Sequence, residues 1–88
     1  MSKIKNIVMS EQKFTVILEL IVPQIIELIS VNDGKDAVKA TKDFYKSELY
    51  SMLEDEETKL WHYSPQTLYT MYESEISTGK IRFPGEEY

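Results

Sequence analysis

The longest run of apolar positions in the chain, from residue 10 to residue 31, has the periodicity of a helix. Its polar side chains recur at helical spacing along one narrow stripe, and most of the remaining circumference is apolar. The stripe is formed by Thr15, Glu19, Pro23, Glu27 and Ser30. An ordinary surface helix has an apolar face only somewhat wider than ~100°, and the face here is about twice that. We therefore expect this helix to be covered on several sides.

Pro23 sits in the middle of the polar stripe, where water can satisfy the carbonyl group that its missing N–H leaves without a partner. One helix kinked at Pro23 is therefore favoured over two shorter helices, the second beginning at Pro23. A strand is disfavoured because apolar and polar residues do not alternate. At the start, Ser10 is suited to cap the helix, and Glu11 and Gln12 suit its first turn.

A turn and a second helix, over residues 33–55, are predicted next. Residues 32–34 have the turn sequence Asn-Asp-Gly, in which Asp33 can cap the following helix. The apolar face of that helix contains Val38, Thr41, Tyr45, Leu49, Met52 and Leu53. An unbroken continuation would place Glu56 in the centre of this face, where an unpaired carboxylate is costly. The helix is therefore expected to end or bend among residues 54–57.

The clearest start and stop signals in the chain enclose a third helix over residues 65–78. Ser64 followed by a proline is favoured at a helix start, and Gly79 can end the helix in the left-handed conformation. The apolar face contains Leu68, Tyr69, Met71, Tyr72 and Ile76, and the outward face contains Gln66, Thr67, Thr70, Glu73, Ser74 and Ser77. Residues 80–83 alternate in character and predict a short extended segment, followed by a loose tail over 84–88.

These patterns predict a single all-α domain of 88 residues. It is expected to be a small bundle of three main helices, over 10–31 with a kink at Pro23, over 33–55 and over 65–78, with a short extended C-terminal segment. The conformation of residues 1–9 is left open, and their apolar side chains are candidates to pack beside the extended segment.

Composition narrows the chemistry further. A chain with 42% apolar and 28% charged residues is typical of a globular protein, and the absence of cysteine excludes disulfides and cysteine-based zinc sites. The apolar run is broken by Glu19, Pro23, Gln24 and Glu27, so we expect a core helix rather than a membrane span. No signal-peptide pattern is present at the start. We expect a cytoplasmic protein that does not bind a membrane.

Charge argues against a nucleic-acid partner. The net charge is −5 and the basic residues are scattered, whereas binding to nucleic acid depends on neutralising phosphates. The outward face of the predicted helix over 65–78 offers no arginine or lysine to a DNA groove. The acidic run over 54–57 lacks the spacing of a calcium loop and is interpreted as a solvated helix end. No cofactor and no metal are expected.

The densest candidate site is the segment over 61–79, which holds the only tryptophan, the only histidine and three of the six tyrosines. The candidate ligand- or partner-binding residues are Trp61, His62, Tyr63, Tyr72 and Glu75. Glu75 is the one charged residue within an otherwise apolar face. Together with Glu56 and His62 it could form an acid–base or metal site. The favoured interpretation is that Glu75 binds a tyrosine hydroxyl or a lysine at the edge of the core, because no nucleophile accompanies it.

No motif in the chain carries a known activity. The sequence favours a non-enzymatic protein–protein interaction domain that forms a homodimer through the wide apolar face of the helix over 10–31. One alternative is a small-ligand or acid–base site around Trp61, His62, Tyr72 and Glu75. Another is an acidic, antitoxin-like regulator of a basic partner.

Overall fold

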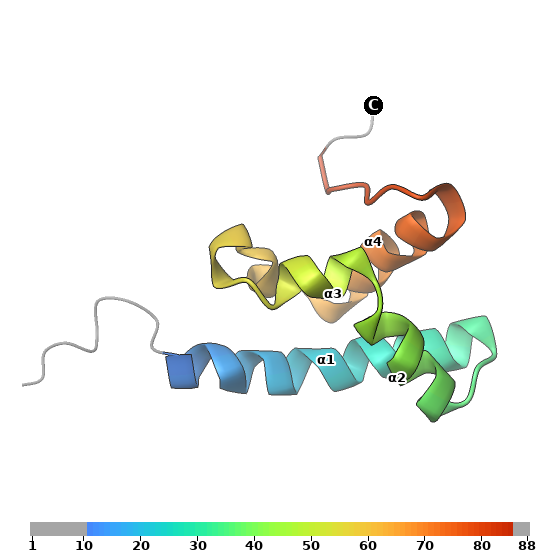
Figure 1. Cartoon of the computed structure of the whole chain (residues 1–88), viewed down its shortest axis with the longest axis horizontal. Coiled ribbons are helices and arrows are strands. Elements are labelled where there is room, and N and C mark those ends of the chain that lie inside the picture. Colours follow the sequence, from blue (N-terminus) through green and yellow to red (C-terminus); the bar gives the residue numbers. More distant parts are fainter. Residues whose placement is uncertain (1–10, 86–88) are drawn as a thin grey trace, which may run out of the picture.

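The computed structural model describes residues 11–85, and this part of the chain is helical and contains no strand (Figure 1). The all-α fold class predicted from the sequence is thereby confirmed. In chain order the elements are the α-helices α1 (Glu11–Asp33), α2 (Ala37–Tyr45) and α3 (Glu48–Leu53), the short 3-10 helices η2 (Glu56–Thr58) and η3 (Leu60–His62), and the α-helix α4 (Pro65–Thr78).

The first helix runs without interruption through Pro23, so one helix is formed rather than two. Pro23 is exposed, in agreement with its predicted place on the wet side. The side-chain amide of Gln24 donates a hydrogen bond to the carbonyl of Leu20 at 2.8 Å, which gives the backbone beside the proline an extra partner. The predicted cap Ser10 and the apolar residues within 1–9 lie outside the described residues.

The structure corrects the predicted single helix over 33–55, which is divided into α2 and α3. The chain leaves the first of these helices after Tyr45, and Ser47 then begins the second as its N-cap. The Ser47 hydroxyl accepts a hydrogen bond from the N–H of Tyr50 at 3.1 Å. A second correction concerns the preceding cap, which is Asp36 rather than Asp33 and accepts from a backbone N–H one turn later at 2.8 Å. At the start of each helix, the capping side chain accepts a hydrogen bond from a backbone N–H that has no helical carbonyl partner.

The α-helical part of this segment ends before Glu56, as expected from the cost of placing its carboxylate in the apolar face. Helix α3 terminates at Leu53, and two 3-10 helices then turn the chain through a corner. The corner is fixed by Lys59, whose backbone is left-handed at φ 62°, and by the Thr58 hydroxyl, which donates to the carbonyl of Met52 at 2.7 Å.

The third predicted helix agrees with the structure at both ends. The hydroxyl of Ser64 accepts from the N–H of Thr67 at 3.1 Å, and Gly79 ends the helix with φ 85°. A bonded N-cap and a left-handed glycine stop are the features that the sequence pattern predicted. Residues 80–85 then leave without helix or strand.

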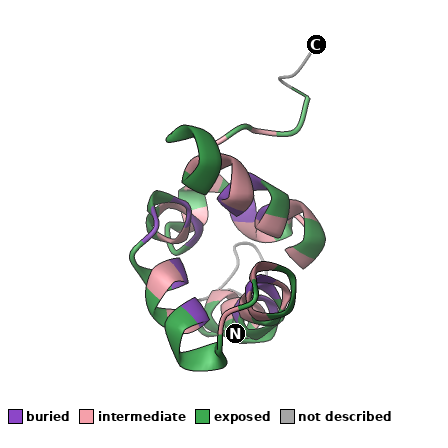
Figure 2. Ribbon diagram, turned by 90° about the vertical axis from the view of Figure 1, so that its right-hand side faces the viewer, coloured by how far each residue is buried: buried purple, intermediate pink, exposed green. Residues whose placement is uncertain are grey.

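The core lies where α2, α3 and α4 meet the C-terminal half of α1. Figure 2 shows the buried segments of these helices in purple, turned toward one another. The buried apolar residues are Ile21, Val22, Ile25, Ile29, Ala40, Phe44, Leu49, Leu53, Leu60, Leu68, Met71 and Tyr72. The contribution of α1 comes entirely from residues 21–29, and none of residues 12–20 is buried. The N-terminal half of this helix is therefore only partly covered by the described residues: Ile17 and Leu18 pack against the core, whereas Val16 and Leu20 are exposed.

Candidate functional site

The aromatic residues predicted as a site form the corner between α3 and α4. Trp61 is half-buried, and its indole N–H donates to the carbonyl of Glu56 at 2.8 Å. His62 is exposed, with its Nδ1 against the carbonyl of Lys59 and its ring 4.4 Å from the ring of Tyr63. These side chains support the turn locally. None of the hydrogen bonds among residues 11–85 links them to Tyr72 or Glu75.

Glu75 binds the start of a neighbouring helix. Its carboxylate accepts one hydrogen bond from the N–H of Glu48 at 2.8 Å and another from the N–H of Leu49 at 3.0 Å. These N–H groups belong to the first turn of α3, where no helical carbonyl can reach them and where the helix dipole favours negative charge. Glu75 thus joins α4 to α3. Its partners are backbone groups and not the tyrosine or lysine that the sequence suggested.

Tyr72 lies in the core, away from the exposed His62. Its side chain is fully buried, with its ring 5.8 Å from that of Phe44 in an edge-on arrangement. Its hydroxyl has no hydrogen-bond partner among the described residues. Burial raises the pKa of Tyr72, and the nearest charges belong to a group of polar residues on α1, α2 and α4. The sequence therefore identified a special residue but not its surroundings.

That group is the main polar feature of the interior, and we call it the polar cluster. Its members are Asp33, Lys35, Asp43, Tyr69 and Glu73, with the Tyr72 hydroxyl at its edge. The hydroxyl of Tyr69 donates to Asp33 at 2.9 Å. The ammonium group of Lys35 lies 2.6 Å from a carboxylate oxygen of Asp43. The cluster joins the end of α1, the turn after it and α2 to one side of α4.

Two carboxyl groups in the cluster face each other. Burial, and next a hydrogen bond with the carboxyl of Asp33, raise the pKa of Glu73 above its ordinary value. One carboxyl oxygen of Glu73 is buried without a partner among the described residues. Burial also raises the pKa of Tyr69, with a further contribution from its bond to Asp33. The arrangement brings two carboxyl groups and a tyrosine together, but it offers no nucleophile.

Sequence reasoning missed this cluster because it assigned Glu73 to the outward face of its helix. A detectable signal was present, since Tyr69 and Glu73 are four residues apart and share one side of α4. The partner Asp33 comes from the end of α1, and only the packing of the helices brings it near. No grouping of histidine, aspartate and glutamate that could hold a metal ion occurs among residues 11–85.

A groove of about 780 Å³ runs along α1 beside α2 and the start of α3. Its apolar side chains include Leu18, Val22 and Ile26 of α1, and it also holds Tyr45 and Tyr50, whose rings stack 4.6 Å apart. The described residues that line it are Thr15, Leu18, Glu19, Val22, Pro23, Ile26, Glu27, Ser30, Ala37, Thr41, Tyr45 and Tyr50. The charged residues among these are all acidic. We call this feature the acidic-edged groove.

A second uncovered surface lies on the side of α1 away from the core. Val16, Leu20 and Val31 are 52%, 63% and 70% exposed, and helical spacing places all three on one side of the helix. We call these three residues the outer row. Exposed aliphatic side chains that line up along one helix are typical of a contact surface.

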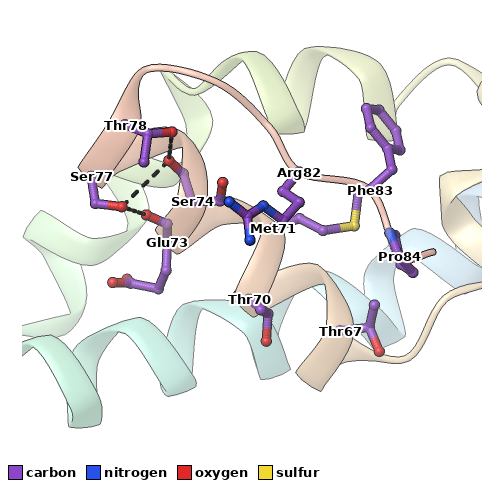
Figure 3. Close-up of a pocket in the computed structure, with 10 residues that line it drawn as sticks. All are labelled: Thr67, Thr70, Met71, Glu73, Ser74, Ser77, Thr78, Arg82, Phe83 and Pro84. Atoms are coloured by element: carbon purple, nitrogen blue, oxygen red, sulfur yellow. Dashed lines mark hydrogen bonds between the residues drawn. The ribbon is translucent and has the colours of Figure 1, made fainter. Parts of the chain in front are cut away.

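A third hollow, of about 550 Å³, lies between α4 and the C-terminal segment (Figure 3). Its lining is rich in hydroxyl groups, but those of Thr70, Ser74 and Ser77 donate to backbone carbonyls of their own surroundings. Figure 3 shows that the Glu73 side chain points away from Arg82. The hollow therefore does not bring an acid, a base and a nucleophile together.

The segment Gln12–Asp33 of α1 is also long and apolar enough to cross a membrane. The fold buries 28% of its apolar stretch of 18 residues. A core helix of a soluble protein meets the same criterion, so this observation is weak evidence. The chain matches no family model, no curated protein and no solved structure. The functional argument therefore rests on the surfaces and contacts described above.

Proposed function

We propose that the protein is a non-enzymatic interaction domain that forms a homodimer through the outer row of α1. The observation that carries the proposal is the exposure of Val16, Leu20 and Val31 on the side of α1 that faces away from the core. Removing such side chains from water is favourable by ~25 cal/mol per Å² of apolar surface. A second copy offers the same unsatisfied surface and gains equally.

The size of the surface fits an interface between two copies. A stable interface buries ~800 Å² on each partner. A helix rises ~1.5 Å per residue and is ~10 Å wide with its side chains, so α1, with 23 residues, is about 35 Å long. Two such helices packed along their length, together with flanking side chains, bury an area of that order.

Charge along the outer side of α1 favours an antiparallel pair centred on Leu20. In a two-fold arrangement, residues at equal distances on either side of Leu20 face each other across the axis. Lys13 then lies opposite Glu27 of the partner copy, seven positions from the centre, and Val16 lies opposite Gln24. In this register the helix is complementary to itself in charge, and the two Leu20 side chains meet at the axis.

The decisive measurement is sedimentation equilibrium of the full chain and of two matched variants. Leu20→Glu places two like charges at the two-fold axis, and such a juxtaposition costs several kcal/mol, so we expect dimerisation to weaken by roughly a hundredfold or more. Ile76→Glu makes the same change at an equally prominent residue of α4, which is 57% exposed, and should leave the dimer intact. A wild-type chain that stays monomeric at the highest attainable concentration contradicts the proposal.

A charge exchange tests the antiparallel register. Lys13→Glu should weaken the dimer, and adding Glu27→Lys should restore it, because the exchanged pair is attractive again across the axis. If a monomeric protein instead floats with lipid vesicles, α1 binds a membrane and the dimer proposal fails.

Two other predictions from the sequence remain predictions. The ligand or acid–base site around Trp61, His62, Tyr72 and Glu75 requires these groups to converge, and their hydrogen bonds lead to separate parts of the fold. The acidic regulator of a basic partner rests on net charge alone. Salt-sensitive co-purification with a cationic protein would support that alternative.

A further inference from the structure

We infer that the acidic-edged groove is the binding site for residues 1–10 of the same chain. These residues lie outside the described part of the structure and join it directly at Glu11, one turn before the groove begins at Thr15. The groove and the dimer surface around the outer row lie on different sides of α1 and share only Glu27 at their border, and the inference does not depend on the dimer.

The groove has a definite chemical character. Leu18 and Ile26 are half-buried and Val22 is buried, so its α1 side presents apolar surface that is already partly withdrawn from water. Glu19 and Glu27 stand in the lining, which contains no positive charge. The occupant that fits best is therefore a short segment with apolar side chains for the floor and positive charges for the acidic edge.

Residues 1–10 have that composition. Ile4, Ile7 and Val8 supply three branched apolar side chains within five positions, and Lys3 and Lys5 supply the positive charges. Lysine stems can cover apolar surface while their ammonium groups reach a carboxylate. No other ten-residue stretch of the chain lies outside the described structure.

The reach of the segment matches the length of the groove. An extended chain spans at most ~3.3–3.6 Å per residue, so Ile7 lies up to about 13–14 Å from Glu11, and Ile4 up to about 23–25 Å. Along α1, at ~1.5 Å per residue, Leu18 is about 11 Å and Ile26 about 22 Å from Glu11. A chain that turns back at the start of α1 can therefore place Ile7 beside Leu18 and Ile4 toward Ile26.

Disulfide trapping in the full chain tests the placement. The chain has no cysteine, so Ile7→Cys with Leu18→Cys introduces a single possible bond. We expect this pair to oxidise within one chain, at least roughly tenfold faster than a control pair of Ile7→Cys with Ile76→Cys on α4, because docking raises the local thiol concentration. Thr15→Cys, at an exposed residue of the groove, replaces Leu18→Cys if that variant does not fold.

Each outcome decides the inference. Slow oxidation at both groove positions, equal to that of the control pair, overturns it. A disulfide formed mainly between two chains also overturns the inference, because the segment then occupies the groove of another copy. The assay is repeated in Leu20→Glu, which weakens the proposed dimer. Trapping within one chain that persists in this variant shows that the groove is occupied independently of the dimer. Charge exchange gives an independent check: Lys5→Glu should slow the trapping, and Glu19→Lys should restore its rate. No response to either change contradicts the proposed role of the acidic edge.

Discussion

Glu73 and Glu75 lie two positions apart on α4, and both are half-buried, yet they meet opposite environments. Glu75 accepts two backbone hydrogen bonds from the first turn of α3. Glu73 faces another carboxyl group, that of Asp33, and one of its oxygens is buried without a partner among the described residues. A half-buried carboxylate therefore has backbone donors at one position, whereas at the other burial and a second carboxyl group raise its pKa.

The difference makes the two attachments of α4 unlike each other. On one side the helix is held to α3 by a side chain bound to two backbone donors. On the other side it is held to the end of α1 by the polar cluster, where ionisation of Glu73 adds repulsion toward Asp33. The second attachment should therefore weaken as the pH rises through the raised pKa of Glu73.

The largest expected effect comes from removing the satisfied carboxylate. Glu75→Ala deletes both acceptors of the α3 N–H groups, and loss of a capping group costs ~1 kcal/mol, up to about 2, of the free energy of unfolding. Urea unfolding followed by the fluorescence of Trp61, the only tryptophan, measures it directly.

Glu75→Gln is the matched control. The amide keeps one acceptor oxygen and the shape of the side chain, so we expect roughly half of the loss. An Ala variant as stable as wild type would show that water replaces Glu75 at the start of α3, and the contrast with Glu73 would then disappear.

Periodicity placed Glu75 on the inner face of its helix but could not name its partner. The N–H groups that it binds lie 27 and 26 positions away in the sequence. The same long-range contact supports the start of α3 in the middle of the segment over 33–55, which the sequence predicted to be one continuous helix. Ser47 followed by Glu48 has the composition of a helix start, a local signal that was outweighed by the apolar face running through it. Glu73 was missed because its partner depends on how the end of α1 packs.

Local chemistry, in contrast, was sufficient for α4. Ser64, Pro65 and Gly79 act through their own backbone conformations and nearest neighbours, so the bounds Pro65–Thr78 follow from the sequence. The local caps Asp36 and Ser47 were nevertheless missed, because the apolar face predicted one continuous helix across them. The partners of Glu73 and Glu75 lie on other helices and could not be predicted from local sequence.

A smaller effect, of opposite sign, is expected at the edge of the polar cluster. The Tyr72 hydroxyl is buried without a partner among the described residues, and an unsatisfied buried polar group costs ~1–3 kcal/mol. Tyr72→Phe keeps the ring that packs on Phe44 and removes the hydroxyl. We expect the free energy of unfolding to rise by about 1 kcal/mol in the same urea assay. A loss of stability would mean that the hydroxyl binds a buried water, and the cluster would then be better satisfied than its protein contacts indicate.

The smallest effect should appear as a pH dependence. The pKa of Glu73 is raised in the fold, so the stability that its protonated form contributes is complete below the ordinary glutamate pKa, about 4.3. That contribution is lost as the pH rises through the raised value. Glu73→Gln imitates the protonated form and should remove this decrease. The charged and titratable groups around Glu73 are Asp33 of α1, Lys35 of the following turn, Asp43 of α2, and Tyr69 and Tyr72 of α4.

Asp43 supplies the control with the opposite sign. The hydrogen bond from Lys35 lowers the pKa of Asp43, so its contribution is present above the ordinary aspartate value and is lost as the pH falls through the lowered one. Asp43→Asn should therefore lower the stability at neutral pH, and its difference from wild type should disappear as the pH falls through the lowered pKa of Asp43. Glu73→Gln should raise the stability only above the ordinary glutamate pKa. A Glu73→Gln protein with the pH profile of wild type would mean that Glu73 ionises freely in the fold. The carboxyl group of Asp33 would then have no effect on the titration of Glu73, and the two glutamates of α4 would differ only in their hydrogen-bond partners.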